Sequence, residues 1–203
     1  MLDPHVLLGA LAIRTSRLHL GVLVNNVTLR RPEVIAGATA ALDIVSNGRA
    51  ILGLGAGTAP NTYFAAEFDA LGISIPTPME RRHELLFDSL ERIRDIWAGN
   101  HDRGVRLPKP LSTIPAVIGL NSVTLATKAA ERGCGINVRG NHPQVDAIIA
   151  QADRSLGDWS ASVWLHYEPE LKNPEHPRLR RFADLGVARI MLMTTSRNDL
   201  LTI

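Results

Sequence analysis

Residues 18–57, LHLGVLVNNVTLRRPEVIAGATAALDIVSNGRAILGLGAG, decide the fold that the sequence predicts. The run at 18–24 is rich in β-forming residues and is typical of a buried strand. Pro32 then begins a helix whose apolar residues Val34, Ile35, Ala38, Ala41, Leu42 and Val45 recur at helical spacing, and Asn47-Gly48 ends it. Residues 49–54 form a second strand. A strand, a helix and a strand in this order predict a βαβ unit, and therefore a parallel sheet.

The same alternation continues on both sides of this stretch. Upstream, Asp3-Pro4 is a helix start signal, and Leu7, Leu8, Leu11 and Ala12 continue the helical spacing up to Thr15. Downstream, a loop is expected to about Pro78 and a long helix from Met79 to Trp97. Further strands are predicted at 114–120, 135–138, 161–167 and 187–193, and helices at 123–131, 143–156, 177–185 and from Asn198. The spacing favours a βα barrel over a doubly wound sheet, although periodicity alone does not separate them.

Length and composition limit the classes of function. The chain has 203 residues, which predicts one domain over 1–203. Lys and Arg number 22 against 20 Asp and Glu, so the net charge of +2 argues against a nucleic-acid or membrane-surface partner. Cys134 is the only cysteine, which excludes an intrachain disulfide, and no Cys/His cluster has zinc spacing. No apolar run is long enough for a membrane span and no signal peptide is evident, so we expect a cytoplasmic protein.

The most conspicuous motif is GLGAG at 53–57. Glycines at a strand exit let the backbone approach a ligand, and their amides can hold an anion. The alternative is a turn that simply requires positive φ. The motif is not the dinucleotide-binding fingerprint, because Thr58 and Pro60 stand where the third glycine would be.

Two other segments carry charge or capping groups that a ligand can use. Asn121 or Ser122 caps a helix after a predicted strand, which is where barrels bind phosphate, although a routine N-cap explains the same pattern. Arg30-Arg31 precedes a helix start, where guanidinium groups oppose the helix dipole. A ligand or a partner carboxylate accounts for them, and so does a solvated surface pair.

We identify no catalytic residue and no metal ligand from the sequence. We expect the aromatic residues Trp159, Trp164, Tyr167 and Phe182 to pack in the core or at its rim.

Taken in order, the motifs resemble the luciferase-like oxidoreductase family, which includes bacterial luciferase relatives and deazaflavin (F420) dependent enzymes. The matching segments are Asp3-Pro4, Thr15 to Gly21, Arg30 to Pro32, Ala41 to Arg49 and Gly53 to Gly57. The resemblance implies an α/β protein of the (β/α)8 TIM-barrel type. It further implies an incomplete barrel here, lacking the first strands and most of the last helix.

The resemblance also implies a cofactor, FMN or F420, and the residues that contact it. The ring side corresponds to Leu23, Val24 and Asn25, often at a non-proline cis bond, and to Ala56, Gly57, Thr58 and Asn61. The phosphate cradle corresponds to Gly119, Leu120, Asn121, Ser122 and Val123. Two positions depart from the family pattern: Thr58 replaces a glutamate acid found in some deazaflavin members, and Gly133-Cys134-Gly135 replaces Ala-Asp-Gly.

The leading hypothesis is therefore a flavin- or deazaflavin-dependent oxidoreductase that acts on a small organic substrate. The longer anionic tail of F420 is a possible ligand of Arg30 and Arg31. Expected partners are a flavin reductase or cofactor-recycling enzyme and a second copy of the chain, because an incomplete barrel exposes an edge strand at Leu20, Val22 and Val24. The alternatives are a non-catalytic flavin-binding or partner-binding remnant, and an inactive truncated product.

Overall fold

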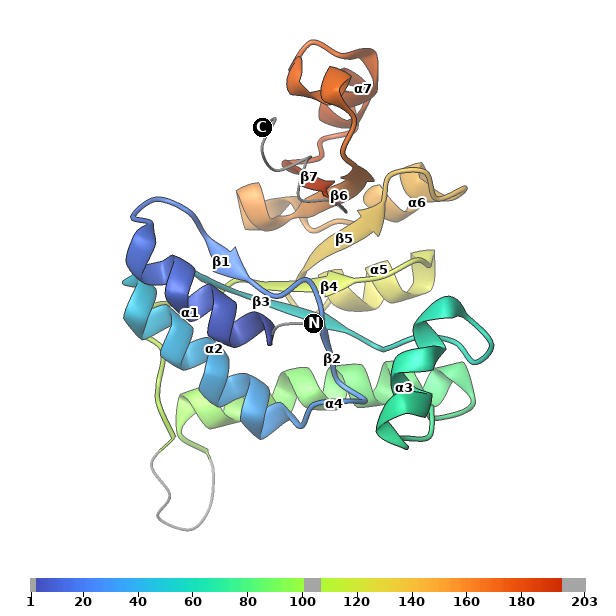
Figure 1. Ribbon diagram of the computed structural model, residues 1–203. Helices are drawn as coiled ribbons and strands as arrows, with labels where there is room; N and C mark the ends of the chain where they lie inside the picture. Colours follow the sequence, from blue (N-terminus) through green and yellow to red (C-terminus); the bar gives the residue numbers. More distant parts are fainter. Residues whose placement is uncertain (1–2, 101–106, 195–203) are drawn as a thin grey trace. The chain divides into compact units, whose positions relative to one another are not determined.

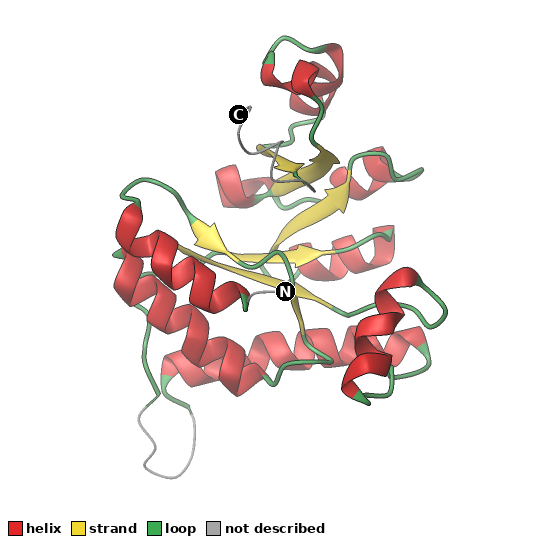
Figure 2. Ribbon diagram, viewed as in Figure 1, coloured by secondary structure: helices red, strands yellow, loops and turns green. Residues whose placement is uncertain are grey.

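The computed structural model describes residues 3–100 and 107–194, and it divides into two compact units, 1–116 and 117–203. Helices and strands alternate in both units (Figure 2). Within each unit the strands that pair do so in parallel. The predicted βα alternation is confirmed. The assignment of 1–203 to one domain stays a prediction.

The first unit is built on strand β3 (Ala50–Gly55), whose register partners are two very short strands. These are β1 (Leu20–Gly21) and β2 (Asn25–Asn26), which place Leu20 opposite Ala50 and Asn25 opposite Leu54. The continuous buried strand expected at 18–24 is therefore wrong. Residues 22–24 form no strand, the Leu23–Val24 peptide bond is cis, and only Leu20 of the seven residues is buried. The resemblance placed a cis bond in this stretch.

Three helices lie side by side in the first unit, in the order α1, α2 and α4 (Figure 1). They are α1 (Pro4–Arg14), α2 (Pro32–Ser46) and α4 (Met79–Ala98). Their predicted starts are confirmed: the Asp3 carboxylate accepts hydrogen bonds from the His5 and Val6 amides, and Pro32 is the first residue of α2. Asn47 ends α2 in the left-handed conformation, with Gly48 at positive φ.

The apolar faces predicted for α1 and α2 are only partly buried. Ile35 and Leu42 are buried, but Val34 and Val45 are more than half exposed, and Leu7 and Leu11 are exposed as well. The prediction erred because helical spacing identifies a stripe but not its width. Small residues, such as Ala36 and Ala40, fill the tight contacts instead. On α4, by contrast, Leu86, Leu90 and Ile93 are fully buried, while Trp97 is half-buried and its indole N–H donates to the Ala36 carbonyl.

The buried carboxylate of Asp43 acts as a brace in the first unit, meaning that its hydrogen bonds connect separate segments of the chain. The Asp43 side chain is fully buried and accepts hydrogen bonds from the Leu111 amide at 2.8 Å and the Ser112 amide at 3.0 Å. It also accepts from the Ser112 hydroxyl and, at 3.4 Å, from the Ala50 amide. One side chain thus joins α2, β3 and the segment before β4, which explains why a buried charge is tolerated here.

Arg49 makes a second brace beside the first. Its guanidinium donates to the carbonyls of Ala12, Thr15, Leu18 and Ser46, at 2.5–2.9 Å, and to the Thr15 hydroxyl. These carbonyls belong to the end of α1, the end of α2 and the segment before β1. The motif from Ala41 to Arg49 therefore supplies internal braces.

The segment expected as a loop up to Pro78 contains two helical pieces. A 3-10 turn, η1 (Tyr63–Ala65), leads into α3 (Ala66–Leu71), which ends at Gly72 with positive φ. The sequence signal was weak because α3 is short and buries only one large side chain, Phe68. A helix this short depends on that tertiary contact.

The second unit is a four-stranded parallel sheet in the order β4, β5, β6, β7. The strands are β4 (Ala116–Gly119), β5 (Gly135–Arg139), β6 (Ala161–His166) and β7 (Arg189–Met193). The helical segments are α5 (Val123–Ala130), α6 (Val145–Ile149), η2 (Arg154–Trp159), η3 (Pro169–Lys172) and α7 (Pro177–Asp184). The four strands match the predicted positions, and Cys134 is a buried residue before β5.

The helix predicted at 143–156 is too long. Helix α6 spans only Val145–Ile149, and a separate 3-10 segment, η2, begins at Arg154. Val145, Ile148, Ile149 and Ala152 are all buried. The helix expected from Asn198 lies outside the described residues. Among the aromatic residues of this unit, Phe182 is fully buried, whereas Trp159, Trp164 and Tyr167 are half-buried.

Candidate functional site

The predicted ring-side residues of the first unit meet at the carboxyl end of β3. The Asn25 side chain is buried, and its amide group donates to the Gly53 carbonyl at 3.1 Å. The Asn26 carboxamide oxygen accepts from the amide and the hydroxyl of Thr28, at 3.0 and 2.6 Å. Asn25 therefore holds the backbone of β3, and Asn26 shapes the turn that follows β2.

The glycines of GLGAG are explained by these same neighbours. A Cβ atom at Gly53 would meet the Val22 carbonyl, and one at Gly55 would meet the Val24 side chain. Gly57 has φ +81°, and a Cβ there would lie 2.9 Å from the Thr28 hydroxyl and 3.0 Å from the Asn26 side-chain oxygen. Close chain packing accounts for the first two glycines and positive φ for the third.

The loop after β3 carries the remaining predicted ring-side residues. The Thr58 and Thr62 hydroxyls share a hydrogen bond of 2.6 Å, and Asn61 has φ +61°. Thr62 also donates to the Ala59 carbonyl. The hydroxyl of Thr58, which stands where some relatives have an acid, is thus engaged within its own loop.

The two arginines before α2 differ in their surroundings. Arg30 donates to the Asp3 carboxylate at 2.6 Å and lies 3.1 Å from the His5 Nδ1 atom. The hydrogen bond from Arg30 lowers the pKa of Asp3, and the amides of Val6 and His5 lower it further. Burial, and then the Arg30 charge, lower the pKa of His5, while Asp3 acts against this. The partner-carboxylate interpretation is therefore confirmed for Arg30.

Arg31 has a carboxylate partner as well but remains largely exposed. Its Nε donates to Glu33 at 3.4 Å, and Glu33 also accepts from Arg92 of α4 at 3.3 Å. A hydrogen bond from its own amide, followed by those from Arg92 and Arg31, lowers the pKa of Glu33. These residues line a cavity of about 420 Å³ between the start of α2 and α4.

The predicted phosphate cradle lies in the second unit, at the start of α5. Ser122 is the N-cap: its backbone is extended, with φ −143° and ψ 148°, and its hydroxyl accepts from the Leu125 amide at 3.2 Å. The Leu120 amide donates to the Asn137 carbonyl, which fixes the approach of the chain to the cap. The amides of Val123 and Thr124 belong to the first turn and have no carbonyl within the helix to bind. Such a terminus suits a phosphate group.

The structure therefore brings the predicted residues together in two groups. In the first group, Leu23 to Asn25 and Ala56 to Gly57 lie around the ends of β2 and β3, and Thr58 to Asn61 belong to the loop that follows. Gly119 to Val123 form the second group, between β4 and α5. Each group lies within one compact unit.

The sequence interpretation missed a set of polar and aromatic residues at the carboxyl ends of β5 and β6. Arg139 lies opposite Trp164 in the strand register, and the Trp164 and His166 rings meet edge to face at 5.6 Å. Alternation along the two strands was the available signal, because Arg139, Trp164 and His166 fall on the positions between the buried apolar residues. We had assigned Trp164 only to packing.

Metal-binding clusters and membrane-spanning helices are absent from the described residues. Residues 3–100 and 107–194 contain no group of three or more His, Cys, Asp or Glu side chains placed to hold a metal ion. Nor does any helix there have the length and apolar character that a membrane crossing needs.

Comparisons with known proteins agree on one family. Residues 1–157 match the family model described as luciferase-like monooxygenase. A 5,10-methylenetetrahydromethanopterin reductase of Archaeoglobus fulgidus is 29% identical over 170 residues, which cover 75% of this chain and 48% of the relative. An F420-dependent glucose-6-phosphate dehydrogenase of Amycolatopsis mediterranei is 38% identical over 93 residues, covering 45% of this chain and 26% of that protein. The chain thus spans half or less of the length of these relatives.

Among solved structures, an F420-dependent secondary alcohol dehydrogenase in complex with an F420-acetone adduct superimposes with a TM-score of 0.74. The match covers 99% of this chain and 81% of that one, at 14% identity. At this identity the likeness establishes the fold alone. The chain has the α/β architecture of the (β/α)8 barrel and comprises an incomplete barrel.

Proposed function

The chain belongs to the luciferase-like monooxygenase family, and from this premise we propose that it is an oxidoreductase that uses F420 or FMN on a small organic substrate. Either cofactor supplies the electron transfer, and the protein supplies placement and exclusion of water. The observation that carries the proposal is the start of α5. There Ser122 caps the helix, and the backbone amides of Val123 and Thr124 have no acceptor within the helix.

In this proposal the cofactor phosphate binds the amides of Val123 and Thr124, beside Gly119, Leu120 and Asn121. Separately, within the first unit, we propose that Leu23, Val24 and Asn25 with Ala56, Gly57, Thr58 and Asn61 contact a cofactor ring. Leu23 is 41% exposed and so offers apolar surface to a ring, whereas Asn25 keeps β3 in place. Because Thr58 is bound to Thr62, a proton donor is not assigned to it.

Titration of FMN and F420 against a variant that loses one amide tests the proposal. Proline is accepted at the first position of a helix, and the extended backbone of Ser122 is compatible with a following proline. Val123→Pro therefore removes one N–H while the helix and its cap remain, and Val123→Ala is the matched control. We expect the affinity for the phosphate-bearing cofactor to fall at least about fivefold in Val123→Pro only. Equal affinities in a folded variant contradict this phosphate site.

The same titration separates the two cofactors, and a reductase or oxygenase assay with the bound one tests the activity. Binding of neither FMN nor F420 contradicts the proposed function. Binding without turnover of any reduced cofactor favours the non-catalytic flavin-binding remnant.

We also propose that the chain self-associates. Val6 and Ile13 of α1 are 75% and 78% exposed, and Val34 and Val45 of α2 are 52% and 53% exposed. Apolar surface on two adjacent helices favours association. We expect a solution mass above that of one chain, and a lower mass for the Ile13→Gln, Val45→Gln double variant. A monomeric wild type contradicts self-association.

A further inference from the structure

The sheet of the second unit has one face that its helices do not cover. A Cβ atom at Gly140 would meet Leu165 and the Phe182 ring of α7, so Leu165 lies on the face that the helix covers. Ala161 and Val163 lie on the same face, because every second residue of a strand points to one side. The intervening residues of β6 occupy the other face: Ser162, Trp164 and His166. The strand register adds their partners on β5 and β7: Asn137, Arg139, Arg189, Met191 and Met193.

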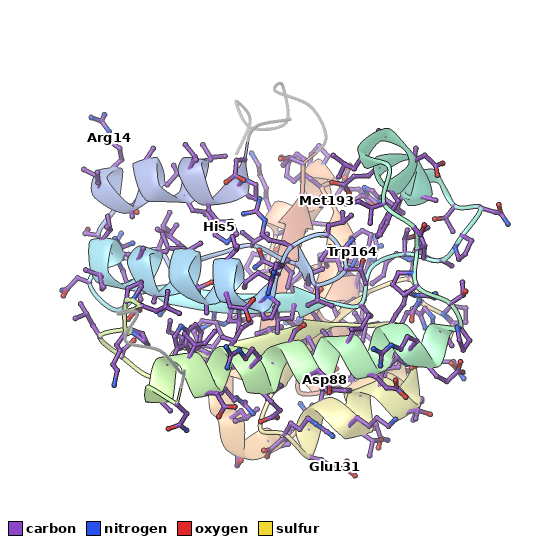
Figure 3. All side chains as sticks on the ribbon, turned by 90° about the horizontal axis from the view of Figure 1, so that it is seen from below. His5, Arg14, Asp88, Glu131, Trp164 and Met193 are labelled. Carbon is purple, nitrogen blue, oxygen red and sulfur yellow. The ribbon has the colours of Figure 1, made fainter. Side chains whose placement is uncertain are left out.

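This face is closed at the amino ends of its strands and open at the carboxyl ends. At the closed end, the Arg189 guanidinium stacks 3.3 Å from the centre of the Trp159 ring. In the middle, Asn137 and Ser162 are buried and bonded to each other at 2.9 Å, with Met191 beside them. At the carboxyl end, Arg139 and His166 are exposed, Trp164 is half-buried and Met193 is 39% exposed (Figure 3 labels Trp164 and Met193).

The chemistry of the open end is specific. Arg139 and Trp164 are neighbours in the register, and His166 holds the Trp164 ring edge to face at an interplanar angle of 76°. The strand residues on this face include two arginines and no carboxylate. The Trp164 indole can stack on a flat apolar molecule while the exposed Arg139 guanidinium pairs with an anionic group on it. The exposed Met193 thioether and His166 imidazole can contact apolar groups of different shapes, so the apolar part of this molecule can vary.

We propose that the carboxyl end of this face binds the substrate, and that the substrate is a planar or unsaturated organic acid whose carboxylate pairs with Arg139 while its apolar body lies on Trp164. This rests on the proposed function, because it names the substrate class of the same oxidoreductase. In (β/α) proteins ligands bind at the carboxyl ends of the strands, which is where this face opens.

Calorimetric titration with two probes tests the proposal without any cofactor. The probes are 2-naphthoate, a flat carboxylate, and 2-naphthamide, its neutral analogue. We expect naphthoate to bind the wild type more tightly than naphthamide. In Arg139→Gln, naphthoate affinity should fall at least about tenfold, with no change for naphthamide. In Trp164→Leu both probes should weaken. Arg132→Gln, which changes the net charge equally at the far end of α5, is the matched control and should bind like the wild type.

Three outcomes overturn the proposal. One is equal affinity for the two probes, and another is equal loss in Arg139→Gln and Arg132→Gln. The third is displacement of naphthoate by saturating FMN or F420, which would assign the face to the cofactor. If neither cofactor binds but naphthoate shows the expected pattern, the proposed function fails while the carboxylate site stands.

Discussion

The polar residues from Asp43 to Arg49 and those at the carboxyl end of the second unit's sheet use their hydrogen-bonding capacity in opposite ways. Asp43 accepts from three backbone amides and a hydroxyl, and Arg49 donates to four carbonyls and a hydroxyl, all inside the first unit. Arg139 and His166 are exposed, and the Val123 and Thr124 amides in the first turn of α5 have no acceptor within the helix. The segment from Asp43 to Arg49 therefore stabilises the fold, whereas the exposed residues of the second unit form the sites that we propose.

The sharpest test of this difference is removal of the buried carboxylate. Asp43→Ala leaves the amides of Ala50, Leu111 and Ser112 without their acceptor, and removes a side chain that is itself fully buried. We expect the free energy of unfolding to fall by about 4 kcal/mol, measured by urea denaturation. Asp69→Ala, on the exposed surface of α3, is the control and should change it by less than about 0.5 kcal/mol. A loss below 1 kcal/mol for Asp43→Ala would show that the brace is dispensable.

Arg49→Lys is expected to have the next largest effect. Lysine keeps the charge but has one nitrogen, so it cannot reach the ends of α1 and α2 together, as the planar guanidinium does. We expect a loss of about 2 kcal/mol in the same denaturation experiment. Full stability of the lysine variant would mean that charge, and not the forked geometry, holds the two helix ends.

The cluster of Asp3, His5 and Arg30 predicts a smaller, pH-dependent effect. The folded-state pKa of His5 lies below the ordinary value of 6.5, so between these two values the unfolded chain binds more protons. Stability therefore decreases as the pH falls through this interval. We expect the thermal midpoint of the wild type to drop about 1 °C more than that of His5→Gln between pH 7 and pH 5.5. Identical slopes for the two proteins contradict the assignment.

The smallest effect on stability is expected at the exposed carboxyl end of the second unit's sheet. Arg139 is exposed and makes no structural brace, so Arg139→Gln should change the free energy of unfolding by less than about 0.5 kcal/mol. Together with the tenfold weaker binding of naphthoate, this would separate binding from folding in one residue. A loss of stability comparable to that of Arg49→Lys would place Arg139 among the braces instead.

Much of the fold was predictable because its signals are local. The caps at Asp3 and Ser122, the proline at the start of α2 and the glycine after α7 each act on their own turn. The long stripe on α4 was equally clear. Prediction failed for the shortest helices, whose formation depends on tertiary contacts. Helix α3 is held by the single buried side chain of Phe68, and α6 ends well before Gly157.

The amino-acid sequence alone predicts the alternation of strands and helices, the family, and the two groups of candidate site residues. Caps, turns and hydrophobic spacing carry that information within a few residues of each position. The folded structure is needed to see that Asp43 and Arg49 are braces, that Arg30 pairs with Asp3, and that Arg139 lies beside Trp164. Most of the partners in these roles lie between 25 and 69 residues away along the chain, and such partners come together only when the strands align and the helices pack.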